Sequence, residues 1–184
     1  LLPETYFYSY GDTRLSVVKR MQQKLVQELQ KVWKKCAKEC QLETPEEALI
    51  LASIIEKETG KSSERAHVSG VFHNRLRLGM PLQSDPTVSY GVTLGNFVLK
   101  RPLSRIDLRT VSPFNTYLNK GLPPRPISNP GLAAIRAAIL PKKTKDLYFV
   151  ADGRGGHVFA STLLEHNRNV MRWRRLQRKA HEKN

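Results

Sequence analysis

The stretch "LILASIIEKETG", residues 49–60, decides the fold of this chain. An almost unbroken apolar run from Leu49 to Ile55 ends in Glu56-Lys57-Glu58 and then a glycine. A helix that is apolar on nearly every face belongs in the interior, so we expect this one to be central. A carboxylate at its buried end is costly unless it is paired or protonated. The two glutamates are therefore either solvated residues of the last turn or the carriers of chemistry.

Local signals set the ends of this helix. Thr44 can cap it, Pro45 suits the first helical position, and Glu47 completes a Thr-x-x-Glu capping box. Gly60 has the character of the residue just beyond a helix C-terminus. The sequence thus predicts a helix from Pro45 to the Gly60 stop.

The flanking segments predict a mixed fold. Outward from residues 49–60 we expect an extended aromatic segment 1–13, an amphipathic helix 13–40, a helix 63–79, long irregular loops 80–130, a helix 129–140, a hairpin within 145–161 and a last helix from Thr162. Helices with a late antiparallel hairpin and long loops indicate the α+β class. We divide the chain into an opening segment and helix (1–42), a catalytic domain (43–170) and a basic tail (171–184).

The amino-acid composition favours a negatively charged partner but does not say which one. The 184 residues hold 31 Lys+Arg against 16 Asp+Glu, a net charge of +15. Such a charge attracts polyanions, and nucleic acid, an anionic membrane and an anionic wall polymer all fit. No apolar run reaches a membrane-spanning length. Cys36 and Cys40 lack a nearby His and continue an apolar stripe, so we expect packed thiols and not a metal site.

The end of the central helix is a candidate site for acid catalysis. Burial and the partial negative charge of a helix C-terminus both raise the pKa of a carboxyl there, as a general acid requires. Glu56 and Glu58 lie about 200° apart around a helix, so they cannot serve one cavity equally. Periodicity alone does not say which of them faces inward.

The loops supply weaker candidates, and several motifs can be dismissed. Asp85 before Pro86 forms a turn or offers a second carboxylate, and the loop "FNTYLNKGLPPRP" offers amides, a hydroxyl and aromatic rings for a sugar. "GRGGHVF" joins two strands and lacks the Lys-Ser/Thr of a phosphate-binding loop. His157 and His166 are too far apart for a local metal signature. No Ser-x-x-Lys, Gly-x-Ser-x-Gly or His-Glu-x-x-His motif occurs.

Six segments in order resemble one known family. They are "PETYFY", "LASIIEKETG", "SERAHVSGVFHNRLRLGMPLQSDPTVSYG", "SPFNTYLNKGLPPRPISNPG", "AAIRAAILP" and "LYFVADGRGGHVFASTLLEHN". Together, from about Pro3 to Asn167, they resemble the catalytic part of the MltG (YceG-like) endolytic murein transglycosylases. The resemblance implies a lyase that breaks the β-1,4 bond between N-acetylmuramic acid and N-acetylglucosamine without water and leaves 1,6-anhydro ends.

The resemblance also assigns residues. It places the catalytic glutamate at the first position of "EKET", which is Glu56. It implies seven residues that line or support the cleft: Gln83, Asp85, Thr87, Tyr90, Asn115, Tyr117 and His157. No cofactor and no metal is implied.

The expected setting follows from the same resemblance. It implies peptidoglycan glycan strands as substrate, penicillin-binding synthases as partners, and a fragment of an inner-membrane protein that faces the periplasm, without the family's membrane anchor and small LysM-like region. Three alternatives stay open: a lysozyme-type hydrolase with Asp85 as second carboxylate, a wall-binding scaffold, and a basic nucleic-acid-binding module, for which no motif is present.

Overall fold

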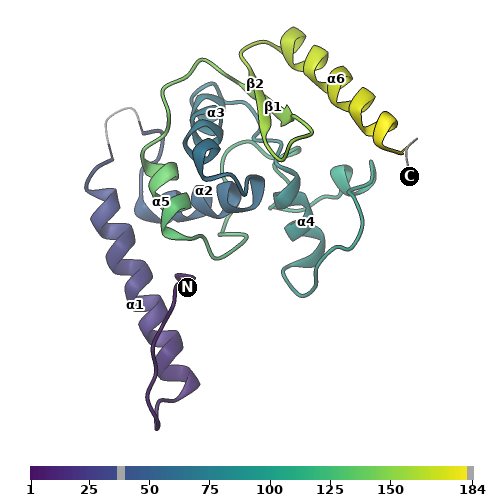
Figure 1. Cartoon of the computed structure of the whole chain (residues 1–184). Coiled ribbons are helices and arrows are strands. Elements are labelled where there is room, and N and C mark those ends of the chain that lie inside the picture. Colours follow the sequence, from purple (N-terminus) through teal and green to yellow (C-terminus); the bar gives the residue numbers. More distant parts are fainter. Residues whose placement is uncertain (37–39, 182–184) are drawn as a thin grey trace.

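The computed structural model describes residues 1–36 and 40–181, and its fold is α+β, as predicted. The elements in chain order are α1 (Arg14–Trp33), α2 (Pro45–Glu58), a 3₁₀ turn η1 (Ser62–Glu64), α3 (Arg65–Arg77), α4 (Asp85–Thr93), a second 3₁₀ turn η2 (Asp107–Arg109), α5 (Leu132–Ile139), β1 (Tyr148–Ala151), β2 (His157–Ala160) and α6 (Leu163–His181). Figure 1 shows α2, α3 and α5 in the body of the molecule, with α1 and α6 at opposite ends. The division into 1–42, 43–170 and 171–184 stays a prediction.

The central position predicted for α2 is confirmed. Its side chains Leu51, Ile54 and Ile55 are fully buried, and the helix contacts α1, α3, α4 and α5. Removing each such side chain from water contributes roughly 1.5–3 kcal/mol, so this helix dominates the core. The last turn of α2 is thereby held in one orientation, which fixes where its glutamates point.

Both ends of α2 follow the sequence signals. The Thr44 side chain accepts a hydrogen bond from the Glu47 backbone N–H, and the Glu47 carboxylate accepts one from the N–H of Glu43. The helix stops at Glu58 because Thr59 turns extended and its hydroxyl accepts a bond from Lys61. Gly60 follows directly after the cap residue Thr59, as the sequence predicts, although its φ does not lie in the left-handed region.

The helix predicted for residues 13–40 ends earlier, at Trp33. Thr13 caps its start as expected, and a short turn follows Trp33. Cys36 and Cys40 are half-buried thiols packed against the core, which confirms their predicted packing, and burial raises the pKa of Cys36 to about 12. Residues 37–39 lie outside the described residues.

The region expected to be irregular, 80–130, contains the helix α4. Asp85 and Pro86 are its first two residues, so the Asp-Pro pair opens a helix and not an isolated turn. Beyond it, residues 94–131 are irregular apart from η2. The polypeptide around Ile127 and Ser128 is fixed to α2 by hydrogen bonds with Ser53, so this loop is an ordered part of the core's edge.

The predicted hairpin is confirmed, with Tyr148 opposite Ala160 and Ala151 opposite His157. Two histidine–carboxylate pairs hold it against η1 and α3. His67 on α3 lies 2.7 Å from an Asp146 oxygen and stacks on Phe159 with ring centroids 3.5 Å apart. Helix α6 then packs on both strands (Figure 1), so the hairpin lies between α6 and the body of the molecule. Among the described residues, no helix has the length and apolar character needed to cross a membrane.

Candidate active site

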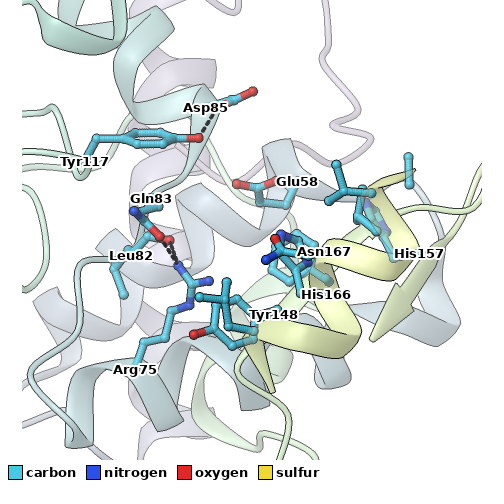
Figure 2. Close-up of a pocket in the computed structure, with 15 residues that line it drawn as sticks. Glu58, Arg75, Leu82, Gln83, Asp85, Tyr117, Tyr148, His157, His166 and Asn167 are labelled. Carbon is cyan, nitrogen blue, oxygen red and sulfur yellow. Dashed lines mark hydrogen bonds between the residues drawn. The ribbon is translucent and has the colours of Figure 1, made fainter. Parts of the chain in front are cut away.

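A cavity of about 510 Å³ opens beside the C-terminal end of α2. Its walls come from α2, α3, the segment that leads into α4, the hairpin and α6 (Figure 2). The polar side chains that line it are Glu58, Arg75, Gln83, Asp85, Tyr117, Tyr148, His157, His166 and Asn167. Elements far apart in the chain therefore meet around the end of the buried helix.

Glu58 is the acid of this cavity. The pKa of its carboxyl is raised to about 7: burial is the main cause and the charge of Asp85 adds to it, while the Ser84 hydroxyl and Arg75 oppose the rise. The Ser84 hydroxyl donates a short hydrogen bond to Oε1. Oε1 is occupied in this way, whereas no described residue forms a hydrogen bond with Oε2. A carboxyl that is half protonated near neutral pH suits general acid catalysis.

Glu56, the residue that the resemblance names as catalytic, does not line this cavity. Its Oε2 accepts a hydrogen bond from the backbone N–H of Gly131, at 3.1 Å. Gly131 precedes α5 and has no capping side chain of its own, so the carboxylate lies at the positive end of that helix. The position of Glu56 thus indicates a structural role, the attachment of α5 to α2.

Asp85 and Tyr117 form a second polar group on the cavity wall. The Tyr117 hydroxyl donates to Asp85 Oδ1 at 2.5 Å (Figure 2). Burial, together with this bond and the nearby negative charge, raises the pKa of the Tyr117 phenol well above its ordinary value. The phenol therefore stays a donor, and it holds the Asp85 carboxylate beside Glu58's cavity as a fixed negative charge.

Arg75 is buried, with 7% of its surface exposed. Its Nε donates to the Leu147 carbonyl, and its Nη1 donates to the carbonyls of Pro81 and Leu82 and to the Gln83 side chain. Gln83 itself has a φ of 50°, in the left-handed region that residues with a side chain seldom adopt. This backbone conformation aims its side chain at Arg75 and the cavity (Figure 2).

His157 enters the cavity from the first residue of β2. Its Nδ1 lies 2.8 Å from Glu64 Oε2, and its backbone N–H donates to Glu64 Oε1 at 3.2 Å. Both side chains are mostly buried, at 16% exposure each. Since the carboxylate accepts at Nδ1, the ring is fixed with Nε2 as its remaining polar atom.

Of the seven predicted supporting residues, four line the cavity: Gln83, Asp85, Tyr117 and His157. Thr87 is buried and bonds Ser84 and Thr116, Tyr90 packs edge-on against Phe114, and Asn115 is buried with its amide bonded to two loop carbonyls. These three residues do not line this cavity, and their predicted part in supporting the cleft stays a prediction. They shape the loops that carry the four residues which do line it.

The sequence reading missed several cavity residues: Arg75, Tyr148, His166 and Asn167, and it did not select Glu58. His166 and Asn167 lie in the first turns of α6, and the His166 ring stacks on Tyr148 at 5.1 Å between centroids. Two adjacent polar residues near the start of a helix do not indicate a binding site in the sequence, because the sequence does not show which surface the helix covers. Within the described residues, no three His, Cys, Asp or Glu side chains come together as a metal site.

The family model of the YceG-like family matches residues 1–172. The chain belongs to the YceG-like family. Over 168 residues it is 39% identical to an endolytic murein transglycosylase of Bacillus subtilis (strain 168), covering 91% of this chain and 45% of that protein. It is 42% identical over 129 residues to an endolytic murein transglycosylase of Streptococcus pneumoniae (serotype 2, strain D39), covering 69% of this chain and 23% of that protein.

A solved structure agrees with this assignment. The chain superposes on a YceG-like protein from Listeria monocytogenes with a TM-score of 0.70 and 35% identity, covering 88% of this chain and 52% of that one. This YceG-like chain thus spans less than half the length of the curated relatives it matches.

Proposed function

We propose that this YceG-like chain is an endolytic murein lyase in which Glu58 acts as the acid and then as the base. One observation carries the proposal: a single carboxyl whose pKa is raised to about 7 by burial faces a cavity large enough for sugar rings. The curated relatives are named for cleavage of murein within strands, which supplies the substrate class.

The reaction needs only this one carboxyl. Protonated Glu58 gives its proton to the oxygen that links the muramic acid C1 to the next sugar, and the C1–oxygen bond breaks. The muramic acid's own 6-hydroxyl oxygen then bonds to C1, and its proton passes to the Glu58 carboxylate. The products are a free sugar hydroxyl and a 1,6-anhydro end, no water is consumed, and the acid is regenerated.

Neighbouring groups fit the two stages. After the first proton transfer, the Ser84 hydroxyl donates a hydrogen bond to the Glu58 carboxylate and so stabilises the ionised form. The fixed negative charge of Asp85 favours the positive charge that develops on the sugar ring when the bond breaks. His157, Gln83 and Arg75 provide polar atoms along the same wall for binding.

The matched pair Glu58→Gln and Glu56→Gln tests the assignment. Both changes replace a carboxyl by an amide in the same helical turn. We expect the first to lower the release of anhydro muropeptides from purified sacculi by at least about a hundredfold. The second is expected to retain most of it. Mass analysis of the products reads the outcome. Full activity in Glu58→Gln, or loss confined to Glu56→Gln, would refute the role of Glu58.

A hydrolase is the second candidate, because Asp85 lines the same cavity as Glu58. A retaining hydrolase uses a second carboxylate as nucleophile. The bond from Tyr117 withdraws electron density from Asp85 and favours the lyase. Digestion in ¹⁸O-labelled water separates the two: the lyase leaves unlabelled anhydro ends, and a hydrolase leaves labelled reducing ends.

The wider setting belongs to the same proposal. We assign peptidoglycan glycan strands as the substrate, a periplasmic face of the inner membrane as the location, and penicillin-binding synthases as partners that supply new strands. The +15 charge supports attraction to the anionic wall. Co-purification of the full-length protein with membranes and with such synthases checks these assignments.

A further inference from the structure

Arg75 is a buried cation whose guanidinium carbon lies 5.2 Å from the centroid of the Tyr148 ring. Among the described residues, no carboxylate lies within ion-pair distance of its guanidinium, whose Nε and Nη1 bond neutral oxygens. Buried charges in proteins are ordinarily paired, because leaving water is costly for an ion. The remaining nitrogen, Nη2, forms no hydrogen bond with any described residue. It is not fully buried, because Arg75 lines the cavity, so solvent in the cavity reaches it.

A charge at this position works against the acid. Arg75 lowers the pKa of Glu58, whereas the reaction needs that pKa to be high. A neutral side chain could hold the same backbone carbonyls without this effect. A full positive charge in the cavity wall, unlike a neutral side chain, can also bind an anionic group of the substrate.

Gln83 adds a donor next to this cation. Its Oε1 accepts from Arg75 Nη1 at 3.3 Å, so its Nε2 group is turned away from the arginine, and no described residue accepts from it. The left-handed backbone at Gln83 is held by its own N–H, which donates to the Thr116 carbonyl. Strained backbone of this kind persists where the surrounding structure over-determines it, often at ligand-binding positions.

We infer that Arg75 Nη2 and Gln83 Nε2 form a two-donor subsite for a carboxylate on the side arm that muramic acid carries at its 3-position. This inference rests on the proposed murein substrate. Of the two sugars, only the muramic acid bears such an arm, whereas the acetamido groups are neutral and common to both. The anion is either the lactyl carboxylate of a strand without peptides or a carboxylate of the attached peptide. The subsite thus sets which sugar lies on the C1 side of the cut bond.

Binding by a chain that cannot turn over its substrate tests the subsite. In a Glu58→Gln background, Gln83→Glu keeps an oxygen facing Arg75 but replaces the donor by a second negative oxygen. Gln177→Glu on α6, which lines a different cavity, is the control with the same change of charge. Calorimetry would compare peptide-free murein oligosaccharides, peptide-bearing ones, and chitin oligosaccharides of equal length.

We expect Gln83→Glu to raise the Kd for murein oligosaccharides about ten- to a hundredfold and to leave the Kd for chitin oligosaccharides unchanged. A rise confined to peptide-free strands assigns the lactyl carboxylate, and a rise confined to peptide-bearing strands assigns the peptide. Equal effects on murein and chitin, or none on either, would overturn the inference. Failure of the Glu58→Gln chain to bind any murein would instead count against the proposed function.

A second variant guards against misfolding. Gln83→Asn retains the amide and tolerates the left-handed backbone, but it withdraws the donor from the cavity. It should change the murein Kd in the same direction by a smaller factor. An unchanged Kd in a folded Gln83→Asn chain, judged by its thermal transition, would contradict the subsite.

Discussion

Replacing the acid should make the chain more stable at alkaline pH. In the folded chain the pKa of Glu58 is about 7, against an ordinary 4.5. Between these values an unfolded chain gives up the Glu58 proton while the folded chain keeps it, so folding stability falls as the pH rises. The difference of 7 − 4.5 = 2.5, at about 1.36 kcal/mol per pKa unit, sets an upper value of about 3 kcal/mol above pH 7.

Glu58→Gln removes this penalty, since an amide does not ionise and its oxygen can still accept from Ser84. We expect the variant to gain about 1–3 kcal/mol in unfolding free energy at pH 8 and nothing at pH 4, where the carboxyl is neutral in both states. Urea denaturation at the two pH values measures the difference. Glu56→Gln is the control: it loses a charge at the start of α5, so it should lose about 0.3–1 kcal/mol at pH 8.

A gain for Glu58→Gln that is equal at both pH values would show that the stabilisation comes from packing and not from the proton. A loss at pH 8 would show that the folded chain favours the ionised carboxylate. Either result would refute the reasoning that gives Glu58 its role as an acid.

Three further predictions concern the same wall of the cavity. The kcat/KM for murein cleavage should be constant below pH 7 and fall about tenfold per pH unit above it, because the acid must carry its proton. Ser84→Ala removes a bond to the carboxylate form, so it should raise the midpoint of this pH profile by about one pH unit. Asp85→Asn removes a negative charge near Glu58 and should lower the midpoint. Midpoints that move in the same direction in both variants would contradict the electrostatic account. Glu64→Gln should lower unfolding free energy by about 1 kcal/mol and reduce kcat/KM severalfold, because it weakens the bonds that fix His157; an unchanged rate with the same loss of stability would make the pair purely structural.

The parts of the fold that local signals specify could be predicted from the sequence. The start of α2 is defined by three residues that are close in sequence, Thr44, Pro45 and Glu47. The apolar side chains that follow them require burial. The hairpin is similarly local, because two short β-prone runs flank a glycine-rich turn. The sequence does not predict α4, since Asp85-Pro86 serves equally as an isolated turn and as the first turn of a helix. The conformation of the residues after Pro86 decides between these two structures.

The choice of acid depends on contacts that no local pattern contains. Both glutamates end the same buried helix, and their surroundings along the chain are nearly alike. The difference comes from Ser84, which bonds Glu58, and from Gly131, which bonds Glu56. These partners lie in distant parts of the sequence, so only the packing of α4 and α5 on α2 shows that Glu56 joins helices while Glu58 faces a cavity.

The first turns of α6 close one side of the cavity, although they are far from Glu58 along the chain. During synthesis the ribosome therefore releases the acid-bearing helix well before the wall that completes its pocket. A nascent chain can bury its hydrophobic interior while this cavity still lacks one side. The cavity is complete only once the segment with His166 and Asn167 has docked, a delay that the order of residues builds into the molecule.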